Sequence, residues 1–309
     1  MPTVVITGAT SGLGRIAAVE LARRGARLVL TARNPSRARD TVAEVRATTP
    51  TARVEVIPVD LSAMGDVARA GAAITAAHPS IDALVNNAGL HAFRQRVTDD
   101  GLPEMMAVNY LAPWLLTHTL LPSLTRTPGS RVISVASEAS RRHGTLTLPH
   151  DLTDTTPFTA RESSLVYGRS KLLDIMFSLE LARRLSDTPT SANCLDPGFN
   201  VTGLGRELRG AAALERTLRA LRIGDPRRGA GLIVRLATDP AFAGVSGGYY
   251  TVRRARALTP VAPADDQDAR ARLWDQTEEL LRPHLRPTTA TPANQPPPAR
   301  TPPGRRPSA

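Results

Sequence analysis

The chain has 309 residues, of which 41% are hydrophobic, and it carries a formal net charge of +11. This length and composition allow one large α/β domain or two small ones, with a sizeable core. Its one cysteine, Cys194, excludes an intramolecular disulfide, and no cysteine and histidine spacing matches a zinc site, so we expect no metal. No apolar run approaches the roughly 18 residues of a membrane span. We therefore expect no signal peptide, no membrane partner and a cytoplasmic location.

The excess positive charge is unevenly distributed. Five arginines fall in residues 282–309, which contain no acidic residue, whereas the other arginines are scattered among acidic residues. No aromatic residues are interleaved with them for base stacking, so we expect no specific nucleic-acid partner. The alternative, a nucleic-acid-binding tail, predicts binding that weakens steeply with salt. Among the 39 basic residues the only lysine is Lys171.

Strand-like runs alternate with amphipathic stretches of helical period along most of the chain. The first helix is expected to begin near Ser11 and to stop at Gly25, which suits a left-handed C-terminal cap. Further helices are expected at about 103–119, 164–185 and 229–237. The seven expected strands are Val4–Thr7, Arg27–Ala32, Val54–Val59, Ala83–Asn86, Arg131–Val135, Ala192–Leu195 and Gly248–Val252. This alternation predicts one Rossmann-type α/β domain, a doubly wound seven-stranded parallel sheet with helices on both faces.

Two segments depart from this alternation. Residues 202–224 place leucines and arginines at helical spacing, which is typical either of a surface helix pair or of a lid over an apolar substrate. From Pro283 onward prolines and threonines dominate and apolar residues nearly vanish. We therefore expect a catalytic domain over residues 1–282 and a disordered tail over 283–309.

The first expected strand ends in a glycine-rich turn that opens a helix. Glycines allow backbone N–H groups to approach a pyrophosphate, and the helix N-terminus adds partial positive charge. A plain tight turn is the alternative, but the strand before it and the amphipathic helix after it favour dinucleotide binding. The residues expected to contact the cofactor here are Gly8, Thr10, Ser11, Gly12, Leu13 and Gly14.

The end of the second strand indicates which dinucleotide is bound. NAD-selective domains place an acidic residue here to bind the ribose 2'-hydroxyl, but residues 31–34 contain none. Arg33, next to Asn34, offers a cationic fork to a 2'-phosphate, so we expect NADP(H), with NAD(H) as the alternative. Arg15 and Arg37 are candidate helpers, and Arg33 could instead be an ordinary surface arginine. Asp60, followed by Leu61, is expected either to bind the adenine amine or to form a turn.

Three further motifs indicate the chemistry. Asn86, Asn87, Ala88 and Gly89 follow the fourth strand, Ser137 follows the fifth, and Tyr167 and Lys171 have the spacing YxxxK. With them the chain resembles the short-chain dehydrogenase/reductase family over residues 3–282. Within the family it is most similar to the retinol-dehydrogenase-like branch. That placement depends on Ala32-Arg33-Asn34, on Asp151-Leu152 and on Leu273-Trp274.

The residue types at the YxxxK motif suit proton transfer. Reducing a carbonyl puts negative charge on oxygen, so a nearby acid must supply a proton, and Tyr167 is the expected acid. A free phenol has a pKa of about 10, and bringing it toward 7 takes about 4 kcal/mol of extra stabilisation of the phenolate. Lys171, one helical turn along, and an oxidised nicotinamide are the expected sources of positive charge. A compact ammonium reaches ribose hydroxyls in a way that a broad guanidinium does not.

The resemblance implies roles for further residues. Ser137 would hold the substrate carbonyl oxygen, although Ser134 and Ser140 are rivals by sequence alone. Asn109 would open a helix and hold water for a proton relay. The remaining cofactor contacts would come from Asn87, Ala88, Gly89, Pro197, Gly198 and Thr202. Asp196 departs from the branch, in which histidine is frequent at this position. His91 and His143 are candidates to touch substrate, or else they are solvated loop histidines.

The sequence therefore predicts an NADP(H)-dependent oxidoreductase that interconverts a carbonyl and an alcohol on a mainly apolar small molecule. The alternative is a catalytically silent dinucleotide-binding regulatory or scaffold protein of the same fold. That class is typically marked by a broken tetrad, whereas Asn109, Ser137, Tyr167 and Lys171 are all present here. The resemblance also implies a homodimer or a homotetramer.

Overall fold

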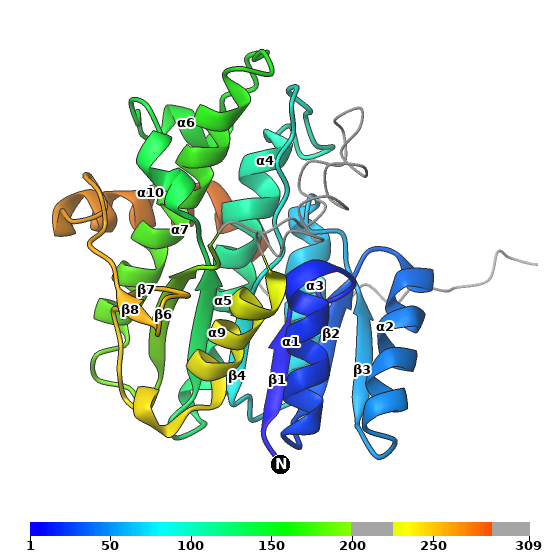
Figure 1. Cartoon of the computed structure of the whole chain (residues 1–309). Coiled ribbons are helices and arrows are strands. Elements are labelled where there is room, and N and C mark those ends of the chain that lie inside the picture. The colour runs from blue at the N-terminus through cyan, green and yellow to red at the C-terminus, as the bar shows by residue number, and fades with distance from the viewer. Residues whose placement is uncertain (199–224, 286–309) are drawn as a thin grey trace, which may run out of the picture.

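The computed structural model describes residues 1–198 and 225–285. Within them an eight-stranded sheet runs in the order β3-β2-β1-β4-β5-β6-β7-β8 (Figure 1). Its strands are β1 (Thr3–Ile6), β2 (Arg27–Ala32), β3 (Val54–Pro58), β4 (Ala83–Asn86), β5 (Arg131–Val135), β6 (Ser191–Asp196), β7 (Tyr249–Thr251) and β8 (Arg256–Ala257). The first seven are parallel, as the sequence predicted, whereas β8 pairs antiparallel with β7. The prediction of seven strands missed β8 because two exposed residues carry no readable period.

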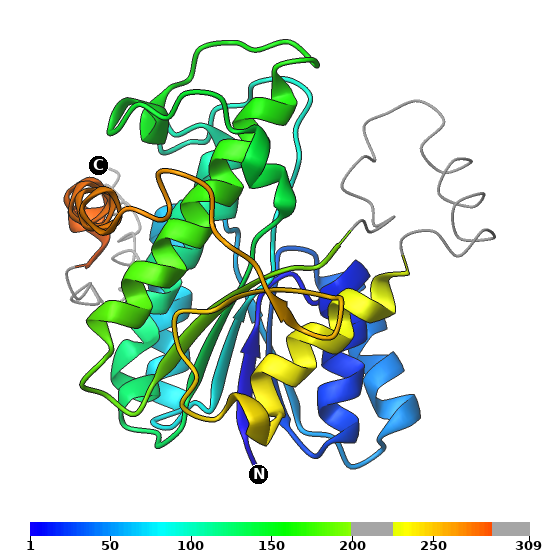
Figure 2. The ribbon, with the colours of Figure 1, turned by 60° about the vertical axis from the view of Figure 1, so that its left-hand side comes forward.

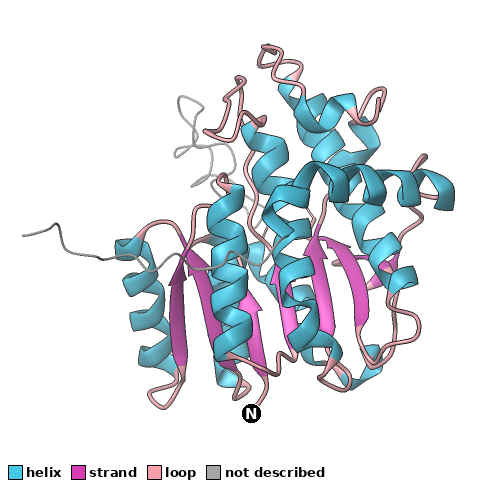
Figure 3. Cartoon of the chain, turned by 180° about the vertical axis from the view of Figure 1, so that it is seen from behind, coloured by secondary structure: helices cyan, strands magenta, loops and turns pink. Residues whose placement is uncertain are grey.

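Helices cover both faces of the sheet because its central strands are buried on both sides. All four residues of β1 and all five of β5 are buried, as parallel strands between two helical layers require. One apolar cluster joins the sheet to α1 (Gly12–Arg23), α2 (Pro35–Thr48) and α9 (Pro226–Thr238). The other joins it to α3 (Met64–Ala77), α5 (Ala112–Thr125), α7 (Ser163–Arg184) and α10 (Gln267–Leu285). Figures 2 and 3 show these two layers from different sides.

The helix ends follow the sequence signals in one case and depart from them in another. Gly25 has φ of 81° and follows α1, as predicted for a left-handed cap, and its N–H donates to the Ala22 carbonyl at 2.9 Å. By contrast, α10 continues through Pro283 to Leu285, past the predicted start of the tail. Buried Trp274 and Leu281 hold this helix on the core, so packing carries it beyond a residue that local propensity disfavours.

The helix predicted at about 103–119 is interrupted. A short helix α4 (Glu104–Met106) passes into a π-helical turn η1 (Ala107–Leu111) before α5 begins. The turn contains Asn109, and the neighbouring Tyr110 hydroxyl lies 2.7 Å from the Thr277 hydroxyl of α10. Helical periodicity alone does not reveal such a turn, because an extra residue per turn is stabilised by tertiary contacts.

The strand order places the loops that bear the predicted motifs at one edge of the sheet. The order reverses between β1 and β4, and in doubly wound sheets ligands bind beyond the carboxyl ends of the strands at such a reversal. The loops after β1, β4, β5 and β6 all start from this edge. Among the described helices none is long and apolar enough to cross a bilayer.

Candidate active site

The glycine-rich loop after β1 is shaped for close approach of another group. Gly8 and Gly12 have φ of 66° and 54°, a conformation that favours glycine. A Cβ on Gly14 would lie 2.4 Å from Asn87 Nδ2 and 2.6 Å from the Gly8 carbonyl oxygen. Ser11, the N-cap of α1, makes no side-chain hydrogen bond to the first turn of the helix, so that turn keeps its N–H groups for another acceptor. The loop therefore fits a pyrophosphate.

The turn after β4 fixes this loop in place. Asn87 Nδ2 donates to the Thr7 carbonyl at 2.9 Å and to the Gly8 carbonyl at 3.3 Å. The backbone N–H groups of Asn87 and Ala88 both donate to the Thr7 hydroxyl at 3.0 Å. Two loops that are distant in the sequence are thereby joined by neutral hydrogen bonds, which makes the loop rigid before any ligand arrives.

The end of β2 supplies the expected cation. Arg33 is exposed, and its Nη1 lies 3.6 Å from an Asp60 carboxylate oxygen. Asp60 also accepts hydrogen bonds from the Ser62 N–H at 2.9 Å and from the Ser62 hydroxyl at 2.7 Å. Burial raises the pKa of Asp60, but these hydrogen bonds and Arg33 outweigh it and leave the pKa below its usual value. Asp60 is therefore a charged group in a tight turn that also orients Arg33.

Two other residues expected at the cofactor end are already engaged. Asn34 is the N-cap of α2, where its side-chain oxygen accepts from the Arg37 N–H at 3.0 Å. Arg15, a candidate helper, pairs instead with Glu44 of α2. Arg33 and Arg37 are the remaining candidates for a 2'-phosphate.

Tyr167 and Lys171 lie on the same face of α7. Lys171 Nζ is 5.9 Å from the centroid of the Tyr167 ring. The ammonium is almost fully buried and donates to the Val135 carbonyl at 3.0 Å and to an Asp174 carboxylate oxygen at 2.8 Å. Asp174 was not predicted to belong to the site, although an acidic residue three positions after a lysine is a recognisable pairing signal on a helix.

The surroundings of the Tyr167 phenol include groups that oppose the expected lowering of its pKa. Burial raises the pKa of Tyr167, Lys171 lowers it, and Asp174 and Asp196 raise it further, so the pKa lies above its usual value. The lowering toward 7 was expected from Lys171 together with an oxidised nicotinamide, so it stays a prediction for the cofactor-bound protein. Sequence reasoning did not count the burial and the two carboxylates, which oppose that lowering.

Gly168 brings the phenol next to Ser137. Ser137 is the N-cap of η2 (Glu138–Arg142), and its hydroxyl accepts from the Ala139 N–H at 3.1 Å. A Cβ on Gly168 would lie 2.7 Å from the carbonyl oxygens of Ala139 and Arg142, so only glycine allows α7 to pack this closely on η2. A hydrogen bond with the Ser137 hydroxyl also lowers the pKa of Tyr167, in opposition to burial. Gly168 was missed by sequence reasoning, although a glycine inside a helix is a signal of close packing.

The rival serines lie deeper. Ser134 and Ser140 are both buried, whereas Ser137 retains partial exposure at the strand end. Neither rival contributes to the surroundings of the Tyr167 phenol. The structure thus brings Ser137 to the tyrosine.

Asn109 acts as a brace in this structure. Its side-chain oxygen accepts from the Leu90 N–H at 2.8 Å, and its Nδ2 donates to the Leu90 carbonyl and to the Ser170 hydroxyl, both at 2.9 Å. It thereby ties the turn after β4 to α7. A Cβ on Gly89 would lie 3.4 Å from Lys171 Nζ and 3.5 Å from the Asn109 side-chain oxygen, so these residues meet at one point.

Two rings from the loop after β4 stack over the ring of Tyr167. The His91 ring stacks on the Tyr167 ring with centroids 4.6 Å apart and an interplanar angle of 16°. Phe93 stacks on the His91 ring, also at 4.6 Å. His91 was a candidate to touch substrate or to be a solvated loop histidine; the structure places its ring against the phenol, and substrate contact stays a prediction.

Asp196, the departure noted at the end of β6, has a bridging role. Its carboxylate accepts from the Glu138 N–H at 3.0 Å and from the Gly198 N–H at 3.1 Å. Burial raises the pKa of Asp196 despite these two hydrogen bonds. The side chain thus joins the loop after β5 to Pro197 and Gly198. Thr202 and the expected lid over residues 202–224 lie outside the described residues.

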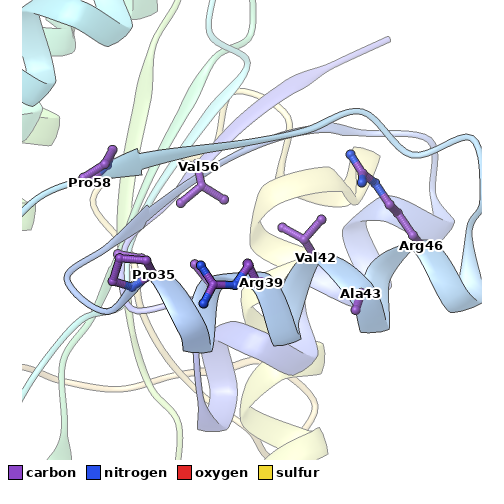
Figure 4. A pocket seen from close by; sticks show the side chains of 9 residues that line it. Pro35, Arg39, Val42, Ala43, Arg46, Val56 and Pro58 are labelled. Carbon is purple, nitrogen blue, oxygen red and sulfur yellow. The ribbon is translucent and has the colours of Figure 1, made fainter.

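A separate apolar groove of about 390 Å³ lies between α2 and β3 (Figure 4). Val42 of α2 points toward Val56 of β3 across it, and Ala43 and Pro58 also line it. The groove lies beside β3, the outermost strand of the sheet, and none of the candidate catalytic residues lines it.

A parallel sheet whose switch point carries a glycine cradle, together with a half-buried tyrosine and a buried lysine beyond β5, defines a nicotinamide-dinucleotide-dependent oxidoreductase. A family model described as short chain dehydrogenase matches residues 2–149. Retinol dehydrogenase 14 of Mus musculus is 34% identical, over 90% of this chain and 85% of its own length. The chain therefore belongs to the short-chain dehydrogenase/reductase family and is similar to its retinol dehydrogenase members.

Two further relatives bear on the chemistry. A putative daunorubicin C-13 ketoreductase, DnrU, from Streptomyces sp. (strain C5), is 37% identical over 88% of this chain and 90% of its own length. Among solved structures, the active-site complex of Pseudomonas aeruginosa RhlG with NADP has a TM-score of 0.62 and 25% identity, covering 81% of this chain and 94% of that one.

Proposed function

We propose that this protein is an NADP(H)-dependent oxidoreductase that interconverts a ketone or aldehyde and the corresponding alcohol on a mainly apolar small molecule. The observation that carries the proposal is the Tyr167 phenol, placed beside the Ser137 hydroxyl and one helical turn from the buried Lys171 ammonium. This cluster lies at the sheet edge from which the glycine loop also starts.

The choice of NADP(H) depends on the cofactor end. Gly8, Gly12 and Gly14 would receive the pyrophosphate, because their backbone allows close approach and the helix N-terminus favours an anion. Arg33 would bind the 2'-phosphate, since no acidic residue stands at the end of β2 to repel it. The relative solved with NADP supports this preference.

The residues of this chain would then divide the work at the carbonyl. A bound nicotinamide supplies or accepts the hydride. Tyr167 donates the proton to the carbonyl oxygen during reduction and takes it back during oxidation. Ser137 donates a hydrogen bond to the same oxygen, and Lys171 stabilises the phenolate that proton transfer leaves behind.

The relatives support the reaction class. Their names specify retinol, an alcohol, and a putative ketoreduction at the C-13 position of daunorubicin. The mainly apolar substrate is inferred from the leucines of segment 202–224, which the sequence predicts as a lid and which lies outside the described residues.

The test is a panel of ketones, aldehydes and alcohols, followed by absorbance with NADPH and NADH in parallel. We expect turnover with at least one apolar carbonyl compound and a lower KM for NADPH than for NADH. The matched blank is Tyr167→Phe, which removes one hydroxyl and should lower kcat by about 10²- to 10⁴-fold. Dinucleotide binding without turnover on any compound would favour the silent regulatory protein, and full activity of the phenylalanine variant would exclude Tyr167 as the acid.

A further inference from the structure

The catalytic lysine has a buried anionic partner on its own helix. Lys171 and Asp174 are 4% and 3% exposed, and their charged atoms are 2.8 Å apart. The Val135 carbonyl, at 3.0 Å, holds the ammonium from the β5 side. Two opposite charges at this distance and this depth act on their neighbours as a pair.

The groups that face this pair come from several elements. Tyr110 of η1 and Cys194 of β6 both interact with Asp174, and burial raises the pKa of each, so both stay neutral at ordinary pH. The Tyr167 phenol is faced by Ser137 after β5 and by Asp196 of β6. His91, from the loop after β4, stacks on its ring. Within the described residues, Lys171 is the only cation that lowers the pKa of Tyr167.

We propose that Asp174 is a positioning residue for proton transfer: it fixes the Lys171 ammonium and offsets its charge, so that Tyr167 keeps its proton at neutral pH and the site favours carbonyl reduction. This inference rests on the proposed function. It assigns a role to a carboxylate that the tyrosine, lysine, serine and asparagine chemistry does not itself use.

The protonation of Tyr167 depends on a balance of the charges around its phenol. An ammonium beside a phenol favours the phenolate, but a carboxylate within hydrogen-bond distance of that ammonium opposes its effect on the phenol. Burial raises the pKa of Asp174 to about 6, in opposition to Lys171, so the carboxylate is mostly ionised at pH 7 and above. Tyr167 and Lys171 titrate as a coupled pair. Removing the negative charge of Asp174 lowers the first pKa of this pair, whichever of the two residues loses that proton.

The principal test is Asp174→Asn, which keeps the shape and a hydrogen-bond acceptor and removes the charge. The pH profile of NADP-dependent alcohol oxidation should move to lower pH by about one unit, because a carboxylate no longer opposes proton loss. The rate of carbonyl reduction should begin to fall at a pH lower by the same amount, because Tyr167 loses its proton there. Asp174→Glu, which restores the charge, should return the profile toward that of the wild type. Asp187→Asn, the same change at an exposed position after α7, should leave it in place.

A second readout needs neither cofactor nor substrate. Titration of the phenolate by ultraviolet absorbance, with Tyr167→Phe subtracted to isolate one of the four tyrosines, reports the Tyr167 pKa directly. It should fall in Asp174→Asn by an amount similar to the shift of the activity profile. If that variant does not fold, the comparison is Lys171→Met against Lys171→Met/Asp174→Asn, since removing both members of a buried pair is often tolerated. The double variant should then show the lower pKa.

The outcomes separate this inference from the proposed function. An unchanged profile and an unchanged phenolate titration, in a wild-type protein that turns over a carbonyl compound, would overturn the role of Asp174 alone. Absence of turnover in the wild type would overturn the proposed function, while the titration would still decide whether Asp174 holds the proton on Tyr167.

Discussion

The loop after β1 and the helix α7 border the same edge of the sheet, but neutral backbone groups build the first and buried charges build the second. At the cofactor end, Gly14 and Asn87 make close contacts and hydrogen bonds without any ionised group. At the chemical end, Lys171 and Asp174 are ionised and almost fully buried. The glycine loop depends on close packing, so substitutions that add atoms there should disturb it. The tyrosine and lysine depend on charge, so substitutions that change the pKa of Tyr167 should disturb them.

The largest effect is expected from a change of shape at constant charge beside Tyr167. Lys171→Arg keeps the positive charge, but a planar guanidinium cannot occupy the point between the Val135 carbonyl and Asp174. We expect kcat to fall by on the order of 10³-fold, with weaker cofactor binding as well. Steady-state kinetics with NADPH and the best carbonyl compound measure both. Kinetics equal to the wild type would show that charge alone suffices at this position.

The next largest effect is expected from adding a methyl group where α7 packs on η2. In Gly168→Ala the added Cβ would lie 2.7 Å from two carbonyl oxygens of η2, so α7 must move away from Ser137. A displacement of about 1 Å of a catalytic group costs about 100-fold in kcat. The matched control is Gly231→Ala in α9, where an added Cβ meets no atom within 4 Å. The account fails here if both variants retain the same activity.

Adding a methyl group in the glycine loop after β1 should weaken cofactor binding and leave the proton-transfer step unchanged. Gly14→Ala puts a Cβ 2.4 Å from Asn87 Nδ2, and overpacking of this kind costs about 2 kcal/mol. We expect the Kd for NADPH to rise about tenfold, with the pH profile of the residual activity unchanged. Calorimetric or fluorescence titration with NADPH measures the Kd. A shifted pH profile would mean that the two ends are not separable.

The smallest effect is expected at Arg33, and it concerns the preference for NADP(H) over NAD(H). Arg33 is exposed, so solvent weakens its interaction with a 2'-phosphate. Arg33→Ala should raise the KM for NADPH about fivefold and leave that for NADH nearly unchanged. Arg15→Ala is the control, because Arg15 pairs with Glu44. Equal losses with both cofactors would remove Arg33 from the choice between them.

Local patterns in the sequence were enough to predict the seven parallel strands and the glycine turn after β1. The strands at Arg27–Ala32 and Arg131–Val135 were predicted with the bounds that the structure has, because buried parallel strands read as short apolar runs between turns. The glycine turn could be predicted because positive φ angles and close backbone contacts require glycine at a few adjacent positions. Tyr167 and Lys171 were found together because one helical turn separates them.

The remaining features depend on contacts between distant segments. The role of Gly168 follows from the carbonyl groups of η2, which lie at some distance in the sequence, and the π-helical turn around Asn109 is held by α10 through Tyr110 and Thr277. The direction of the Tyr167 pKa depends on burial and on Asp196, which local spacing does not report. The two residues of β8 were too few to show a period.

The central claim is that Tyr167 and Lys171 act as one unit in proton transfer, and a double-mutant cycle tests it most directly. The kcat of carbonyl reduction is measured for wild type, Tyr167→Phe, Lys171→Met and the double variant. If the lysine acts through the phenol, the double variant should be about as slow as Tyr167→Phe alone. Losses that multiply, so that the double variant is slower by the product of the two single effects, would show that the two residues act independently and would contradict the account.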